Sequence, residues 1–411
     1  KDAPLSDAAK KDLFRLYKQT EDYMPGLNST EKKAKLARMS YADFLTGPAK
    51  CDPAVLPFLQ TRPHPLYGVG IDAVPAQDAW GLGLPGFDGM KLDPKPGVGM
   101  NRDSIPNEEA EKYFFHFPDG NASIARMLVR KLIPAAIPGK NAEDIVLARA
   151  RYNQLDKADS PARIRLSSTV VRVKPADNSV EVSYVRDGKL ATLRGSKCVL
   201  ACWHTVIPYI CPDLPRDQQT ALAFAVKVPI VYARAAIRNW TSWVKMGVQK
   251  VEAPGHYFFS QSLSMPLSIG GYDTAATPEE PVVVALERTP CSPGLPARQQ
   301  HRVGRAELLA TNFETFERHI REEMAAIFGP GGFDPARDIT GIAVHRWPHG
   351  YAYQYNSLFD PFWLDGEEGP CAVARKPFGR ITIANSDAEA YAYTDSAINE
   401  GYRAVQELLG T

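Results

Sequence analysis

The C-terminal stretch from Gly379 to Leu409 constrains the fold most, because it has the pattern of a strand, a turn and a helix in direct succession. Arg380 to Ala384 is a short run rich in β-branched residues, and Asn385-Ser386-Asp387 is a polar turn. Thr394 to Leu409 has helical periodicity, and its predicted apolar stripe contains Ile398, Val405, Leu408 and Leu409. A strand that leads through a turn into a helix is half of a nucleotide-binding unit.

The start of this helix has two interpretations. A helix N-terminus presents unpaired N–H groups and a partial positive charge, so Thr394, Asp395 and Ser396 are candidates for holding a pyrophosphate. The alternative is an ordinary terminal helix capped by Asp395 or Ser396. The sequence contains no GxGxxG, so the usual glycine-rich partner of such a helix is missing from it.

Size and charge narrow the class of protein. With 411 residues and 44% hydrophobic content the chain can bury one large core or two, so we expect two domains. Its net charge of +1 provides no general attraction for nucleic acid or anionic membranes, which favours a small-molecule partner. There is no run of eighteen apolar residues, so we expect no membrane span. Six scattered cysteines argue against a disulfide framework.

The rest of the chain alternates between helical and strand patterns. Helical periodicity covers 7–24, 29–46 and a segment from Asn121, and a long helix is predicted near Glu307 to Phe328. Strand patterns with a turn at Asp187-Gly188 predict a β-meander made of 164–166, 170–173, 180–185 and 199–203. Further strands are predicted around Ile230 and across Val282 to Leu286.

Three motifs of the chain resemble motifs of the flavin-containing amine oxidases. Within that family, they are most similar to those of the bacterial spermidine dehydrogenases. The first is Leu166 to Val173, which matches a Leu-x-x-x-Val-x-x-Val segment that follows a strand, a glycine turn and a helix. The resemblance implies that the backbone of Val170 contacts the adenine end of FAD. From its spacing alone, Val170 is a core strand residue.

The second motif is the C-terminal turn and helix. The family has Ala-Gly-Glu and then Gly-Ala-x-x-x-Gly, where this chain has Asn385-Ser386-Asp387 and Ser396 to Gly401. The resemblance implies that Asn385, Ser386 and Asp387 bind FAD, with Asp387 accepting a hydrogen bond from a ribityl hydroxyl. It also places the amides of Thr394, Asp395 and Ser396 near the flavin pyrimidine and the pyrophosphate, and Gly401 at a close approach of helix and sheet. For Asp387 a turn-stabilising role is an equal alternative.

The third motif, Arg346 to Tyr353, resembles a loop that faces the flavin ring. Aromatic side chains exclude water and glycine admits close approach, which suits a lined cavity. The resemblance implies that Trp347, His349, Tyr351 and Tyr353 are the catalytic residues. Such a pocket favours the neutral amine that can lose a hydride, and His349 is the candidate for orienting the substrate or moving a proton. Without the resemblance, an aromatic segment of this kind is more often simple core.

The resemblance implies an α/β fold in which a partial FAD-binding, Rossmann-like domain is interleaved with a substrate domain built on a mixed β-sheet flanked by helices. Residues 1–109 are expected to form the helical and loop part of the substrate domain and 226–369 its sheet and helices. Residues 110–225 and 370–411 are expected to form the middle and C-terminal parts of the FAD-binding domain. The family's GxGxxG segment would precede Lys1 or lie on another chain, so we expect the polypeptide alone to hold FAD poorly.

The implied function is oxidation of a spermidine-like polyamine by hydride transfer to FAD, giving an aminoaldehyde and a shorter amine. The positive distal nitrogens of such a substrate need carboxylates, and Asp360, Asp365, Glu367 and Glu368 are candidates, although each is also consistent with a solvated acidic loop. Some family members also carry haem b, whose His or Met ligand the spacing does not identify, and no metal site is predicted. The compartment, bacterial cytoplasm or periplasm, stays open. The alternatives are a non-catalytic binding module of the same fold and a related FAD enzyme acting on an apolar substrate.

Overall fold

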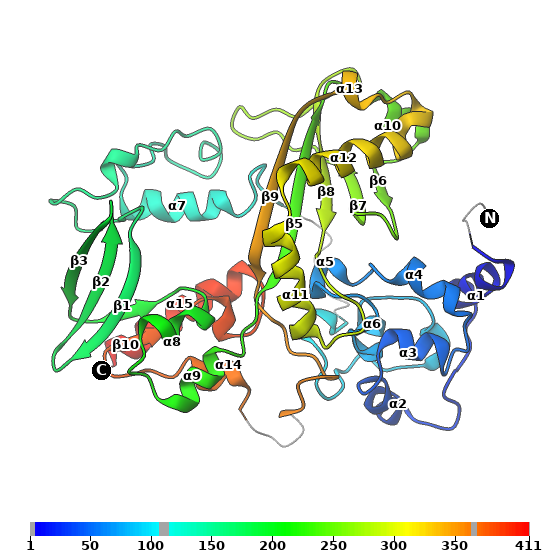
Figure 1. Ribbon diagram of the computed structural model, residues 1–411, viewed down its shortest axis with the longest axis horizontal. Coiled ribbons are helices and arrows are strands. Elements are labelled where there is room, and N and C mark those ends of the chain that lie inside the picture. The colour runs from blue at the N-terminus through cyan, green and yellow to red at the C-terminus, as the bar shows by residue number, and fades with distance from the viewer. Residues whose placement is uncertain (1–4, 107–114, 363–367, 411) are drawn as a thin grey trace.

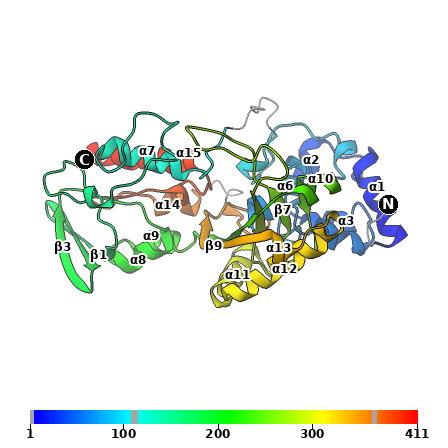
Figure 2. The ribbon, with the colours of Figure 1, turned by 90° about the horizontal axis from the view of Figure 1, so that it is seen from above.

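The computed structural model describes residues 5–106, 115–362 and 368–410. Figure 1 shows a central antiparallel sheet with a helical region on one side and a smaller region of strands and helices on the other. The two ends of the described chain lie at opposite ends of the molecule (Figures 1 and 2).

The first region consists of short helices. It contains α1 (Asp7–Lys18), α2 (Ser29–Leu36), α3 (Tyr41–Thr46), α4 (Leu56–Leu59), α5 (His64–Tyr67) and α6 (Ala76–Gly81). Phe44 and Phe87 stack at its centre with ring centroids 4.6 Å apart. Gly68, which ends α5 with φ +66, lies so close to the central sheet that a Cβ there would be 2.1 Å from a methyl of Val228. The helical region therefore packs directly onto the start of strand β5 of the central sheet.

The central sheet has the strand order β6-β7-β8-β5-β9 and is antiparallel throughout. Its strands are β5 (Val228–Ile237), β6 (Lys250–Glu252), β7 (Ser260–Leu263), β8 (Val282–Arg288) and β9 (Ile339–Tyr351). The α/β class is confirmed, but the mixed sheet expected for the substrate domain is wrong in this detail. Neighbouring strands of this sheet run in opposite directions, so their pairing needs no crossover helix.

Helices cover one face of this sheet. α11 (Ala297–Ala310) and α12 (Phe313–Phe328) pack against the sheet, and α10 (Thr241–Met246) and α13 (Pro335–Asp338) pack against α12. Alternate residues of β5, among them Val231 and Ala233, pack against Phe316 and Ile320 of α12, because successive strand residues face opposite sides of the sheet. The single long helix predicted near Glu307 to Phe328 is in fact two helices. The chain breaks at Asn312, whose side chain accepts a hydrogen bond from the Thr315 amide and so caps α12.

The smaller region contains a meander and a parallel strand pair. The meander is β1 (Thr169–Ala176), β2 (Ser179–Arg186) and β3 (Lys189–Gly195), with Asp187 and Gly188 both at positive φ in the predicted turn. Two of the predicted meander strands were misassigned. Residues 164–166 form no strand, and 199–203 overlap β4 (Cys198–Leu200), which pairs in parallel with β10 (Ile381–Ile383). The third meander strand is β3, whose residues lie mostly at the surface and lack a strong alternation.

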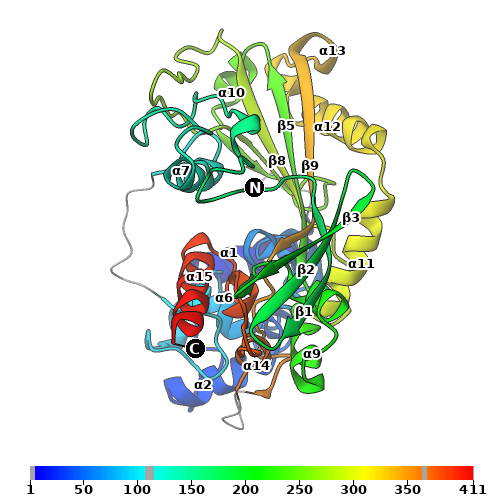
Figure 3. The same cartoon turned by 90° about the vertical axis from the view of Figure 1, so that its left-hand side faces the viewer.

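The remaining helices also lie in this smaller region. They are α7 (Ala122–Leu132), α8 (Ile207–Ile210), α9 (Arg216–Leu222), α14 (Pro370–Ala374) and α15 (Thr394–Leu409). Figure 3 looks onto this end of the molecule, with α15 on one side, the meander on the other and α7 above. None of the helices in the described part of the chain is long and apolar enough to cross a membrane.

Candidate functional site

The carboxyl ends of β4 and β10 open onto the candidate site. Ile383 pairs with Leu200, and the Ala384 amide continues the pairing by donating to the Leu200 carbonyl at 2.9 Å. Asn385 then takes a φ of +90° and its Nδ2 donates to the Cys202 carbonyl at 2.6 Å. In parallel sheets, ligands bind beyond the carboxyl ends of the strands, so the two turns that follow β4 and β10 are where a site is expected.

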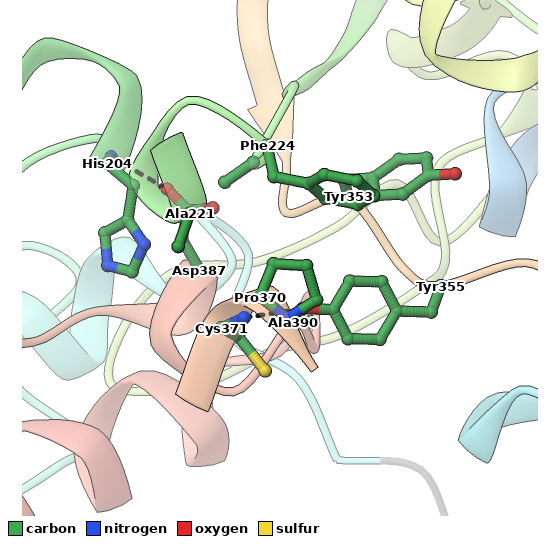
Figure 4. Close-up of a pocket in the computed structure, with 10 residues that line it drawn as sticks. His204, Ala221, Phe224, Tyr353, Tyr355, Pro370, Cys371, Asp387 and Ala390 are labelled. Atoms are coloured by element: carbon green, nitrogen blue, oxygen red, sulfur yellow. Dashed lines mark hydrogen bonds between the residues drawn. The ribbon is translucent and has the colours of Figure 1, made fainter. Parts of the chain in front are cut away.

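A buried ion pair joins these turns to the central sheet. Lys227, at the start of β5, places its Nζ 2.7 Å from Oδ1 of Asp387, which lies in the short helix η8 (Ser386–Ala388). The other carboxylate oxygen of Asp387 accepts the His204 amide at 3.2 Å, as Figure 4 shows. All three residues are buried. Asp387 therefore connects three segments that are far apart in the sequence, and both of its oxygens are engaged within the protein.

A small cavity lies beside this cluster (Figure 4). It measures about 10 Å³, which is room for about one water molecule. Its lining is mainly apolar and aromatic and comprises His204, Ala221, Phe224, Ala225, Tyr353, Tyr355, Pro370, Cys371, Asp387 and Ala390. Burial lowers the pKa of His204 to about 4, so the imidazole is neutral near pH 7. A ligand larger than a water molecule needs these side chains to move apart.

The aromatic motif predicted as a loop is instead the end of strand β9. Residues 346–351 pair with β5, with a register shift between Val228 and Ile230. Gly350 lies at this irregularity, where a Cβ would be 2.5 Å from Ile230 Cγ1 and 3.0 Å from the Val228 carbonyl oxygen. The glycine therefore allows close approach as expected, although the neighbour is strand β5.

The predicted catalytic side chains have different neighbours. Trp347 and His349 lie on the same side of β9, and both are exposed. The His349 ring packs on the Trp203 ring with centroids 4.1 Å apart. Tyr351 hydrogen-bonds through its hydroxyl to the Tyr232 hydroxyl. Tyr353 is buried, lines the cavity and donates to Asp360 Oδ2 at 2.5 Å.

The segment containing His349 reaches the turn after β4, which brings the third motif to the parallel strand pair. Although part of the His349 side chain is exposed, the burial of the rest lowers its pKa, and the positive charges of Arg305 and Lys227 also lower it. Arg305 itself donates to the carbonyls of Pro348, at 2.8 Å, and Lys227, at 2.6 Å, and so fixes the end of β9 to the start of β5.

The start of α15 is not capped by a side chain. Its N-cap residue is Tyr393, so the cap expected from Asp395 or Ser396 is wrong. Thr394 Oγ1 accepts a 2.6 Å hydrogen bond from Nδ2 of Asn121, the N-cap residue of α7, so the two helices begin side by side. Ser396 is fully buried, and its Oγ has no hydrogen-bond partner among the described residues. Asp395 is exposed. This is a chemically suitable place for an anion.

Three details of the predicted cofactor site differ from expectation. Val170 is 37% exposed and is not a core residue, because the β1 register shifts between Val170 and Arg172 and the buried position is Val173. Around the Cβ position of Gly401 nothing in the described chain lies within 4 Å, so this glycine does not serve a close helix approach. The buried face of α15 consists of Ser396, Glu400, Ala404 and Leu408, whereas Ile398, Val405 and Leu409 of the predicted stripe are exposed.

Of the predicted substrate carboxylates, the structure describes Asp360 and Glu368. Asp360 is buried, and its Oδ2 accepts the Tyr353 hydroxyl and, at 3.0 Å, the Asn356 amide. Arg298 Nε lies 3.9 Å from the other oxygen. Asp365 and Glu367 lie outside the described residues, and Glu368 pairs with Lys376 at the surface at 3.0 Å. In this structure Asp360 holds the segment after β9 in place.

Sequence reasoning missed Trp203, His204 and Lys227. Their positions are set by pairing between segments that are distant in sequence, which no local pattern reveals. One signal was available for Lys227, since a lysine between Val226 and Val228 at the start of an apolar strand requires a buried partner.

Comparison with known proteins places this arrangement in a fold class. No protein-family model matches the chain, and no curated protein matches its sequence. Among solved structures, however, amine oxidases superimpose on nearly its whole length. The chain therefore has the amine oxidase fold.

Two of these structures are a putrescine oxidase and a cyclohexylamine oxidase. Putrescine oxidase, in a structure bound to putrescine, shares 14% identity with a TM-score of 0.50 over 99% of this chain and 77% of its own. Cyclohexylamine oxidase from Brevibacterium oxydans IH-35A shares 13% identity with a TM-score of 0.52 over 98% of this chain and 76% of its own. At these identities the likeness concerns the fold alone.

Proposed function

We propose that this chain binds FAD and oxidises an amine. One observation carries the proposal: the aromatic end of β9 lies against the turn that follows the parallel strands β4 and β10, through the contact between His349 and Trp203 at 4.1 Å. An amine-oxidising flavoenzyme needs such a junction, because the substrate must meet the cofactor where the two parts of the molecule join. The likeness of the fold to that of two amine oxidases supports the same reading.

The donor groups at the start of α15 fit the phosphate end of FAD. The first-turn amides of Thr394, Asp395 and Ser396 would hold the pyrophosphate, and the unpartnered Ser396 Oγ would supply one more donor. When bound, FAD supplies the hydride acceptor for amine oxidation. The flavin ring needs more room than the cavity of about 10 Å³ provides, so binding it requires the lining side chains to move.

The adenosine end is proposed to need a further segment or chain. A parallel sheet is normally covered on both faces, but here it has only two strands among the described residues. Beside it, α15 exposes Tyr402 by 69% and Leu409 by 70%, and α7 exposes Leu132 by 57%. An additional glycine-rich strand and helix would extend the sheet and cover these side chains.

His349 is proposed to orient the amine and to accept a proton. Its lowered pKa keeps the ring neutral at neutral pH, so that a nitrogen lone pair is available. Trp347 would cover the substrate from the same side of β9. Tyr351 and Tyr353 are proposed to shape the pocket, since their hydroxyls bind Tyr232 and Asp360.

The finer proposal for the substrate is a polyamine such as spermidine, with a basic nitrogen beyond the reacting one. The putrescine bound in the structure of putrescine oxidase supports a diamine. Cyclohexylamine oxidase has a similar fold, which keeps a monoamine as the alternative. Haem b is not part of the proposal.

The test is flavin reduction in the protein expressed from its complete reading frame. The purified protein should retain the visible absorbance of oxidised flavin, and anaerobic addition of spermidine should bleach it. n-Butylamine and spermidine, compared at equal concentrations, separate a monoamine from a polyamine preference. A protein that binds no flavin would instead support the non-catalytic binding module, and flavin that no amine reduces would rule out amine oxidation.

A further inference from the structure

Arg102 packs against the turn between η8 and α15, where it lies over an aromatic ring and beside a carboxylate. Its Cζ is 4.2 Å from the centre of the Tyr391 ring, and its Nη1 is 3.0 Å from Oε1 of Glu389. The Arg102 side chain is 57% exposed, so it reaches this position from the surface. A guanidinium over a tyrosine face and against a carboxylate shows that this place accepts a cation.

A second ring and a second carboxylate complete the surroundings. The ring centroids of Tyr391 and Tyr393 are 4.7 Å apart with their planes at 33°, and Tyr393 is 40% exposed. Burial, followed by the neighbouring Asp103, raises the pKa of Tyr391 to about 12. Asp103 also accepts a hydrogen bond of 2.6 Å from Gln354. Two aromatic rings with carboxylates beside them have the composition of sites that recognise ammonium ions.

Glu389 has unused capacity to bind a donor. Its Oε2 is buried and has no hydrogen-bond partner among the described residues, while Oε1 faces Arg102. A buried carboxylate oxygen without a hydrogen-bond donor is unfavourable. A ligand that donates a hydrogen bond to this oxygen would therefore bind more favourably. Arg102 therefore satisfies the cluster only in part.

The turn that carries these residues also borders the cavity. Ala390 takes a φ of +50° and lines the cavity, whereas the adjacent Glu389 and Tyr391 hold Arg102. A non-glycine residue with positive φ is costly, and such residues concentrate at functional positions. Neighbouring residues of one short turn therefore contact both Arg102 and the cavity.

We propose that Glu389, Tyr391 and Tyr393 form a binding site for the second, non-reacting ammonium group of the substrate, and that Arg102 occupies this site as an internal competitor. This inference rests on the proposed amine oxidation. It assigns the preference for diamines and polyamines over monoamines to four residues that are not among the predicted substrate carboxylates. The ligand displaces the guanidinium from Tyr391 and donates to both oxygens of Glu389.

Direct binding tests the site without turnover. Spermidine and n-butylamine would be titrated calorimetrically into the same protein and into its variants. Arg102→Ala should tighten spermidine binding about threefold or more, because it removes the competitor, whereas Glu389→Gln and Tyr391→Leu should weaken it about tenfold. n-Butylamine binding should change by less than twofold in all three variants.

The control pair is Arg194 and Glu181, an ion pair of 2.5 Å between β3 and β2 whose arginine side chain is 69% exposed. Arg194→Ala and Glu181→Gln should leave spermidine binding unchanged. If Arg102→Ala weakens spermidine binding, or if butylamine binding changes as much as spermidine binding, the inference is wrong. Thermal unfolding of each variant shows whether a loss reflects misfolding, and the gain expected for Arg102→Ala does not depend on that comparison.

The proposed function fails in a different way. If amines reduce the flavin but the opposite effects of Arg102→Ala and Glu389→Gln on spermidine are absent, only the ammonium site is refuted. If those opposite effects are present but no amine reduces the flavin, the site binds polyamines and the oxidation is refuted.

Discussion

Lys227 and Asp387 form an ion pair of 2.7 Å that joins the first residue before the central sheet to the turn after β10. The lysine is 8% exposed and the aspartate 2% exposed. Removing water from two charges is costly, and a pair of this kind is maintained by the contacts around it. It therefore matters chiefly as the connection between the two parts of the molecule that meet at the site.

Breaking this pair from one side should be strongly destabilising. Lys227→Met leaves the Asp387 carboxylate buried without its cation, and we expect the free energy of unfolding to fall by about 3–5 kcal/mol. Urea denaturation measures this change. The double variant Lys227→Met/Asp387→Leu should recover part of the loss, and a double variant with the full sum of both single losses would show that the two residues do not interact.

Two glycines should respond to alanine in opposite directions. At Gly350 a methyl group would collide with β5, so Gly350→Ala should destabilise the protein by about 1–3 kcal/mol. At Gly401, inside α15, the space is open among the described residues, so Gly401→Ala should stabilise it by about 0.5–1 kcal/mol. Thermal unfolding checks both, and a destabilising Gly401→Ala would indicate that another segment packs closely there.

His301 predicts a pH dependence of stability. It is fully buried, and burial, followed by the charge of Arg305, lowers its pKa from 6.5 to about 3. Below pH 6.5 the unfolded chain binds a proton at this residue that the folded protein does not bind. Stability from this residue is therefore complete above pH 6.5 and is lost progressively as the pH falls from 6.5 toward 3.

Replacement of His301 removes this term. The destabilisation caused by His301→Gln should be smaller by about 2 kcal/mol at pH 5 than at pH 7, because only the wild type loses stability on acidification at this residue. Paired urea titrations at the two pH values measure the difference. A destabilisation by His301→Gln that is the same at both pH values would contradict this account.

The parts of the fold that sequence could predict are those with local signals. The strand, turn and helix at 380–409 are local, and so are the Asp187-Gly188 turn and the apolar run of β5. The break at Asn312 was missed because apolar periodicity continues across it, although the capping asparagine was visible in the sequence. The run 199–203 was wrongly assigned to the meander because β4 is short and apolar, and only the strand pairing shows that β3 completes the meander while β4 pairs with β10.

The candidate site was less predictable for a physical reason. His349 could be identified from its aromatic neighbours, but its partner Trp203 comes from the turn after β4, which is distant in sequence. Asp387 could be identified as the polar residue of a turn, but its cation, Lys227, lies directly before β5, in a separate strand pattern. Long-range pairs of this kind are determined by tertiary packing and leave no periodic trace in the sequence.

The last prediction concerns His349, which is proposed to act on the amine as a neutral base. Burial and the charges of Arg305 and Lys227 lower its pKa, so an activity that depends on the neutral ring should decline only below about pH 6.5. His349→Ala should reduce turnover more than tenfold and remove this acid limb from the pH profile. His345→Ala removes an exposed imidazole from the same side of β9 and should preserve both turnover and the acid limb.

Since Trp203 packs on the His349 ring, Trp203→Leu should lower turnover through misorientation of the ring while the acid limb remains. Unchanged turnover in His349→Ala would exclude this residue from the site, and loss of the limb in Trp203→Leu would assign the titration to a different group.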